Sequence, residues 1–151
     1  MEVAAVFEER YWYPDDGGEV WIAGYTPVAA DGRYLGRDAP ELAARGLRVC
    51  GVAGAGRHHA TALESDAAAP GSPLTLRRDP ANEHDANAVM VLAGGEQIGW
   101  VPRDVAVEIA GEMDAGRPWT AVVLREHRRS PRDPRSGATM LLAPAESVRL
   151  L

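Results

Sequence analysis

The chain has 151 residues, 46% of them hydrophobic, and a formal net charge of −6. Its length suits one domain, or one domain with an extension, and its acidic balance argues against a protein that coats nucleic acid by electrostatics alone. One cysteine excludes an intrachain disulfide, and the absence of long apolar runs or a signal-peptide pattern predicts a cytoplasmic protein without a membrane anchor.

Residues 1–45 form an aromatic, acidic segment. They hold seven of the nine aromatic residues, and nine acids against four arginines. Two apolar runs, roughly 3–13 and 19–25, flank the turn signal PDDGGE and predict a hairpin. Residues 30–46 predict a loop and a short helix, with Pro40 near the start of the helix and Gly46 at its end. We expect residues 1–45 to be an extension that packs on the main domain, with a partner-binding face as the alternative.

The segment 47–101 reads as four strands, at 47–53, 74–79, 88–93 and 96–101. The first run contains Cys50, which we expect in the core. Gly94-Gly95 separates the last two runs and predicts a two-residue hairpin turn, since both central residues of a type I′ turn need positive φ.

Residues 102–116 predict a helix, because Pro102 and Asp104 suit its first turn and Gly116 its end. Its apolar face comprises Val105, Ala106, Ile109, Ala110 and Met113. Strands are expected at 119–127 and 138–144, joined by an exposed loop rich in arginine and proline. The pattern over 46–151 therefore predicts a mainly β domain. A partly closed barrel of about six strands, with one or two helices, would hide the strand edges.

The stretch 76–106 carries the most specific pattern of the chain. It reads DP-x-N-x-x-D-x-N-A-V, then a glycine hairpin, then x-I-G-W-V-P-R-x-x-A at a helix start. This pattern resembles the HIRAN domain family, and the resemblance extends over roughly 47–145. The family occurs at the N-terminus of SWI/SNF-type DNA-remodelling proteins and as small stand-alone bacterial proteins. The resemblance implies an OB-like barrel that captures the 3′ end of single-stranded DNA.

The resemblance also assigns roles to individual residues. Arg57 and Arg103 would bind phosphate, and Asp85 with Asn82 would take the terminal hydroxyl. His58 and His59 stand where the family has two aromatic residues that stack on a terminal base, and histidine offers a smaller face for stacking. Each role has a structural alternative, namely a solvated loop for 57–59, loop bracing for Asn82 and Asp85, and core packing for Trp100. The predicted nucleic-acid-binding residues are Arg57, His58, His59, Asn82, Asp85, Trp100 and Arg103.

Residues 117–135 hold six arginines against Glu126 and Asp133. Arginine suits phosphate recognition because its planar group donates in a fixed fork. This segment is therefore a candidate surface for backbone contacts, although a charge run is often simply solvated. The candidates are five of the six arginines, namely Arg125, Arg128, Arg129, Arg132 and Arg135.

The resemblance implies a non-enzymatic module that recognises single-stranded DNA 3′ ends in DNA repair or replication-fork processing. No cofactor or metal is expected. The chain has no lysine, so a Walker A site is excluded, and His58, His59, His84 and Asp85 lack an established metal-binding spacing. One alternative is a protein-interaction adaptor that uses the aromatic segment, and a DNA-processing protein would be a suitable partner. The other is a small metal-dependent hydrolase or nuclease that uses the His84–Asp85 pair.

Overall fold

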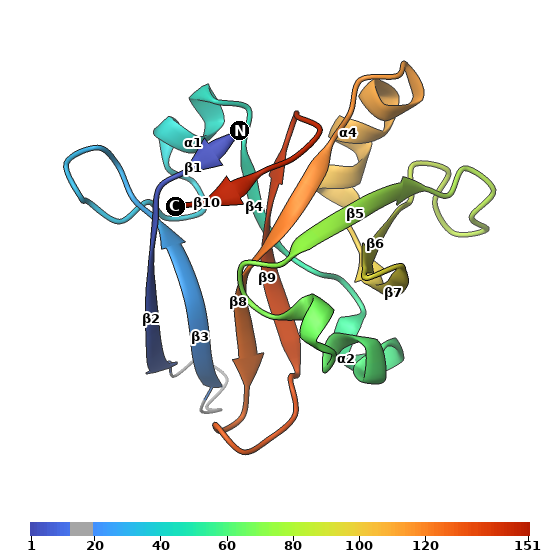
Figure 1. Ribbon diagram of the computed structural model, residues 1–151. Helices are drawn as coiled ribbons and strands as arrows, with labels where there is room; N and C mark the ends of the chain where they lie inside the picture. Colours follow the sequence, from blue (N-terminus) through green and yellow to red (C-terminus); the bar gives the residue numbers. More distant parts are fainter. Residues whose placement is uncertain (13–19) are drawn as a thin grey trace.

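The computed structural model describes residues 1–12 and 20–151 (Figure 1). The predicted turn PDDGGE lies outside the described residues. The strands are β1 (Glu2–Val3), β2 (Ala5–Trp12), β3 (Val20–Pro27), β4 (Arg48–Gly51), β5 (Pro73–Arg78), β6 (Val89–Ala93), β7 (Glu96–Trp100), β8 (Thr120–Arg128), β9 (Gly137–Ala143) and β10 (Arg149–Leu150). The helices are α1 (Pro40–Ala44), α2 (Ala55–His58), α3 (Ala60–Leu63), α4 (Arg103–Asp114) and the 3-10 turn η1 (Asp66–Ala68).

Six strands, β4 to β9, form the barrel. The order is β4-β9-β8-β5-β6-β7, and every pair in it is antiparallel. The sheet stays open between β4 and β7, where an isolated bridge replaces a ladder: Ala53 and Trp100 exchange backbone hydrogen bonds of 2.8 and 2.9 Å. The fold is thus mainly β and OB-like, with a partly closed barrel, as predicted.

Gly99 permits this close approach of the two strand ends. A Cβ atom at Gly99 would lie 2.5 Å from the carbonyl oxygen of Ala53 and 2.6 Å from Val52 Cγ1. These distances are too short for a side chain, so the closure of the barrel depends on glycine at this position.

Two hydrophobic cores lie on opposite faces of β8 and β9. One fills the barrel and includes Val123, Met140 and Ile109 of α4, whereas the other packs Leu124 and Leu141 against Leu42 of α1. Strands that are buried on both faces read as continuous apolar runs, which explains the runs AVVL and MLLA. Cys50 is buried in the barrel core, as predicted, and burial raises the pKa of its thiol to about 12.

The hairpin β2–β3 extends the sheet beyond β8, and Figure 1 shows it on the side opposite β5–β7. Its two strands pair over their full length, from Ala5–Pro27 to Trp12–Val20, which confirms the predicted hairpin strands. The division of the chain between residues 45 and 46 stays a prediction.

The other predicted elements also appear, with shifted ends. α4 runs from 103 to 114, inside the predicted 102–116, and both Gly94 and Gly95 have positive φ in the β6–β7 turn. α2, α3 and η1 are additional elements, each too short to produce a helical period in the sequence. None of the described helices is long and apolar enough to cross a membrane.

Candidate functional site

The loop between β5 and β6 is held by its own polar side chains. Oδ1 of Asn82 accepts the backbone N–H groups of His84 and Asp85, at 2.9 and 3.1 Å. Nδ2 of Asn82 donates to Asp79, and Oδ1 of Asp85 accepts the N–H of Asn87 at 2.9 Å. These side chains form turns of the Asx type, which brace the loop together with its backbone hydrogen bonds, such as that from Asp79 N–H to the carbonyl of Ala88 at 3.0 Å. Asn82 is thus occupied in bracing the loop.

Arg78, which the sequence did not single out, ties this loop to α4. Its guanidinium donates to the carbonyls of Ala86 and Ala88, at 2.8 and 2.6 Å, and to both carboxylate oxygens of Asp114, at 2.9 and 3.2 Å. A planar fork of donors suits this divergent set of acceptors. The partners lie 8 to 36 residues away in the sequence, so no local pattern indicates the clamp.

The braced loop forms one wall of a pocket of about 270 Å³. The other walls come from the end of β7, the first residue of α4 and Ala53. Four predicted site residues, Asn82, Asp85, Trp100 and Arg103, therefore meet in one cavity. His84, which the sequence indicated only as a metal ligand or catalytic residue, lines it too. The full lining is Ala53, Asn82, His84, Asp85, Ala88, Trp100, Val101 and Arg103.

Asp85 and Arg103 form a loose ion pair in this pocket. Oδ2 of Asp85 lies 3.9 Å from Nε of Arg103, and the side chains are 22% and 73% exposed, respectively. Nη2 of Arg103 also donates to the carbonyl of His84 at 3.0 Å. The pair leaves one carboxylate oxygen and most of a guanidinium accessible to a ligand that carries both a donor and an anionic group.

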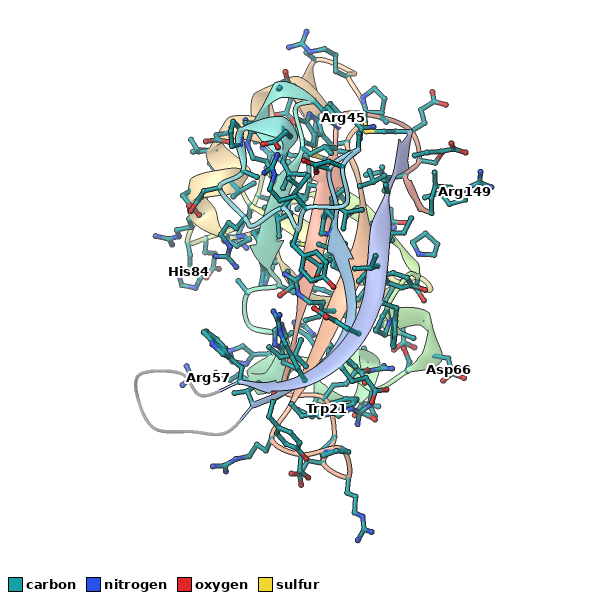
Figure 2. All side chains as sticks on the ribbon, turned by 90° about the vertical axis from the view of Figure 1, so that its left-hand side faces the viewer. Trp21, Arg45, Arg57, Asp66, His84 and Arg149 are labelled. Atoms are coloured by element: carbon teal, nitrogen blue, oxygen red, sulfur yellow. The ribbon has the colours of Figure 1, made fainter. Side chains whose placement is uncertain are left out.

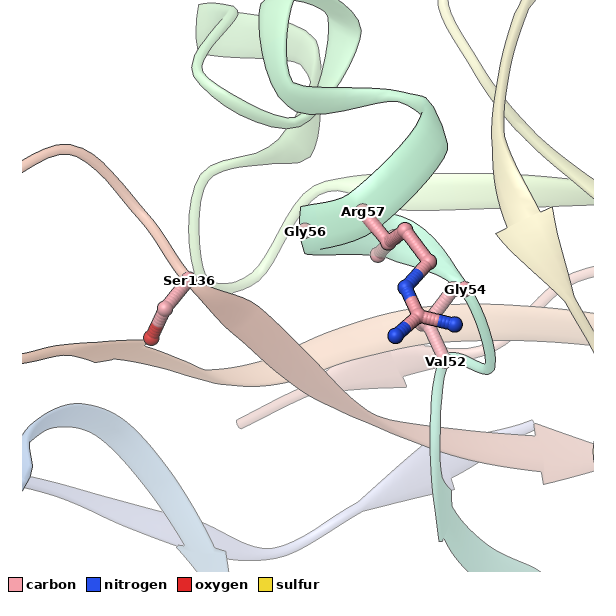
Figure 3. A pocket seen from close by; sticks show the side chains of 6 residues that line it. Val52, Gly54, Gly56, Arg57 and Ser136 are labelled. Carbon is pink, nitrogen blue, oxygen red and sulfur yellow. The ribbon is translucent and has the colours of Figure 1, made fainter.

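Arg57 lies in a separate, adjoining hollow of about 460 Å³, lined by Val52, Gly54, Ala55, Gly56, Arg57 and Ser136. Figure 3 shows its guanidinium turned toward Val52 and Gly54, with Ser136 across the hollow. In Figure 2, Arg57 and His84 lie toward the same side of the molecule, away from Asp66. This hollow adjoins the pocket at Asp85 (the Asp85 pocket), because Gly54 lines the hollow and the preceding residue, Ala53, lines the pocket.

The two histidines after Arg57 border the same hollow, and His58 also lies beside Gly54. A Cβ atom at Gly54 would lie 3.6 Å from the ring of His58 and 3.8 Å from that of Trp100, so His58 and Trp100 flank the same glycine. His59 borders a hollow beside Glu96 and Gln97, which His58 also lines. The two histidine rings are 6.4 Å apart at 71°. His58 is thus the histidine placed near the Asp85 pocket.

The arginine-rich segment does not present one continuous surface. Arg125 is partly buried and donates to the carbonyl of Tyr25 at 3.0 Å. Arg128 donates to Glu126, Glu64 and the carbonyl of Asp133. Arg129, by contrast, is exposed.

Arg135 completes a buried cluster with Glu126. It donates to that carboxylate and to the carbonyls of Leu63 and Ser65, at 2.9 and 2.7 Å. Burial alone would raise the pKa of Glu126, but hydrogen bonds from Arg128 and Arg135 outweigh it and hold the pKa below its ordinary value. These two guanidinium groups hold the β8–β9 hairpin against α3.

Within residues 1–12 and 20–151, no three His, Cys, Asp or Glu side chains converge as metal ligands do. His84 and Asp85 line one pocket, whereas His58 and His59 border the hollow beside Glu96.

The chain is similar to known proteins in its sequence and in its fold. Residues 47–135 match the model of the HIRAN domain family. The fold is similar to the HIRAN domain of human HLTF, with 21% identity, coverage of 66% of this chain and 78% of that chain, and a TM-score of 0.46. It is also similar to a protein from Lactobacillus plantarum, with 19% identity, coverage of 63% and 91%, and a TM-score of 0.48. No curated protein matches.

Proposed function

This chain belongs to the HIRAN family of DNA-binding domains, and from that premise we propose that it binds the 3′ end of single-stranded DNA in the Asp85 pocket. The observation that carries the proposal is the convergence of Asp85, Trp100 and Arg103 on one cavity. They come from a loop, a strand end and a helix start. Together they offer an acceptor for a hydroxyl, an apolar wall and a cation.

The size of the pocket and the carboxylate inside it favour an end over a continuous strand. Its volume of about 270 Å³ lies just below the range of about 300–1,000 Å³ that is typical of sites for drug-sized ligands. A carboxylate inside it repels an internal phosphate but accepts a hydrogen bond from a free hydroxyl. A protein of net charge −6 can bind DNA in this way, because only the last nucleotides need to approach it.

The neighbouring residues supply contacts for the preceding nucleotides. Arg57 adds a cation in the adjoining hollow, and His58 lies next to Trp100 across Gly54. A base stacked on such rings gains ~1–3 kcal/mol. We assign His84 a stacking role as well, since it lines the same pocket. The function is binding without catalysis, and the expected setting is DNA repair or replication-fork processing in the cytoplasm.

The test compares three short single strands by fluorescence anisotropy: one with a free 3′-hydroxyl, one with a 3′-phosphate and one closed circle. We expect the parent to prefer the 3′-hydroxyl by roughly tenfold or more, the size of a hydrogen bond to a charged group. Asp85→Asn removes the charge yet keeps an oxygen for the N–H of Asn87, so the loop is retained. We expect this variant to lose the preference for the hydroxyl over the phosphate.

Asp104→Asn is the matched control, because Asp104 is an exposed carboxylate in the first turn of α4 that does not line the pocket. It should keep the preference of the parent. Equal binding of all three strands by the parent, or an unchanged preference in Asp85→Asn, contradicts end capture through Asp85.

A further inference from the structure

Strand β2 lies at the outer edge of the sheet. Among the described strands, β2 ends the strand order and pairs with β3 from Ala5 to Trp12. It is eight residues long and carries three exposed aromatic side chains: Phe7 is 54%, Tyr11 49% and Trp12 57% exposed. A long edge strand of this kind is a template on which another strand can pair.

The hydrogen bonds at the start of β2 show which backbone groups face outward. Val28 N–H donates to the carbonyl of Ala4, on the β3 side, whereas Ala5 N–H donates to the carbonyl of Leu151, on the other side. Alternation along a strand then directs the N–H and C=O groups of Phe7, Glu9 and Tyr11 to the open edge. Pro27 fits this phase, because it pairs with Ala5 at a position that needs no N–H.

The sequence of β2 is complementary to itself in the antiparallel direction. When the strand is paired with a second copy about Glu9, Phe7 faces Tyr11, Val6 faces Trp12, and Glu8 faces Arg10. Apolar residues thus meet apolar residues, and opposite charges meet. The same register makes Phe7, Glu9 and Tyr11 the hydrogen-bonded positions, in agreement with the outward groups of the edge.

The charged side chains of this strand are held only weakly in the monomer. Arg10 Nη1 and the hydroxyl of Tyr34 each lie 3.4 Å from a carboxylate oxygen of Glu8, at the long limit of a hydrogen bond. Glu8 and Arg10 can therefore re-pair across an interface at little cost. Glu9 faces its own symmetry mate, which opposes the pairing and keeps it weak.

We propose that two copies of this chain associate through antiparallel pairing of their β2 strands about a two-fold axis at Glu9. The sheets of the two copies then join edge to edge. Because a single strand edge buries less than the roughly 1,200 Å² of a stable interface, the dimer is a weak one with a dissociation constant on the order of tens of micromolar.

Sedimentation velocity of the full chain over about 5–300 µM, a range chosen for a weak interface, tests the proposal. The parent should shift from monomer to dimer across this range. Arg10→Glu places like charges opposite each other in both symmetry-related pairs and should raise the dimer dissociation constant by about tenfold or more. The double variant Glu8→Arg/Arg10→Glu restores opposite charges and should recover most of the parent's association.

Two further variants test the position of the two-fold axis and the specificity of the charge effect. Glu9→Gln removes the repulsion at the axis and should tighten the dimer several-fold. Arg117→Glu makes the same charge change as Arg10→Glu at an exposed position after α4, and it should leave the association unchanged. A parent that stays monomeric throughout the range overturns the proposal, and the partner of the β2 edge would then be a strand of a different protein. A dimer that ignores Arg10→Glu, or a double variant that fails to recover, overturns it as well.

Discussion

Two groups of arginine and carboxylate in this chain look alike in the sequence but differ in the fold. Glu126 lies between Arg128 and Arg135, and the side chains of Glu126 and Arg135 are only 9% and 8% exposed. Arg103 lies 3.9 Å from Asp85 and is mostly exposed. The first group is closed, because its donors are used by a carboxylate and backbone carbonyls. The second is open, because its donors still face solvent.

The difference separates an arginine that builds the fold from one that can hold a ligand. A buried guanidinium cannot leave its partners without leaving the carboxylate buried and unpaired. An exposed one exchanges water for phosphate at little cost to the fold. The count of arginines in residues 117–135 is thus a poor guide to phosphate contacts, whereas the pairing of each one is a good guide.

The largest effect is expected from opening the closed group. Arg135→Ala leaves the carbonyls of Leu63 and Ser65 without this donor and removes one of the two arginines from Glu126. We expect a loss of about 2–4 kcal/mol in the free energy of unfolding, measured by urea denaturation. Arg129→Ala, at an exposed neighbour, should change it by less than about 0.5 kcal/mol. Similar stability in both variants would mean that the closed group is not structural.

An intermediate effect concerns pH at the same end of β8. Burial, reinforced by Arg125 and Arg37, lowers the pKa of His127 to about 4, and its Nε2 lies 2.8 Å from Oγ1 of Thr139. Because the unfolded chain binds the proton more tightly, stability should fall as pH drops from about 6.5 to about 4, by on the order of 2 kcal/mol. His127→Gln should flatten this part of the profile in denaturation at several pH values. A variant with the slope of the parent would refute the assignment.

The smallest effect on stability is expected from the open group. Arg103→Ala should change the free energy of unfolding by less than about 1 kcal/mol, since the ion pair is exposed. It should weaken binding of a 3′-hydroxyl strand by about tenfold. It should also reduce the slope of log affinity against log salt concentration by about one, the value for one lost phosphate contact. Titrations at several salt concentrations measure both. If the variant loses stability but keeps its affinity, Arg103 stabilises the fold and does not bind the ligand.

Local patterns in the sequence predict much of this fold. The apolar runs, the Gly94-Gly95 turn and the apolar face with Ile109 fix the strands and α4, because strand pairing and helix burial leave a period in the sequence. The short turns α2 and α3 leave no such period. They depend on contacts such as that of Gly56, where a Cβ atom would lie 2.3 Å from the carbonyl oxygen of Ser136.

The candidate site is less predictable than the fold. The motif at 76–106 contains Asp85, Trp100 and Arg103, and these residues do meet in one pocket. The pairing of Arg135 with Glu126 and with Leu63, and the clamp of Arg78 on Asp114, join residues that are distant in the sequence. Only the fold brings these charges together. The sequence therefore indicates which groups have the right chemistry, and the fold decides which of them remain available.

The bridge between Ala53 and Trp100 joins the two ends of the barrel, and the same two residues line the Asp85 pocket. The bridge that closes the barrel (the seam) therefore also forms part of the pocket wall. Opening of the seam would release the amide protons of Ala53 and Trp100 to exchange with deuterium, and a ligand held against Trp100 would slow this exchange. The exchange rate of these two amides therefore depends on whether the pocket is occupied, so hydrogen exchange at the barrel closure would report ligand binding.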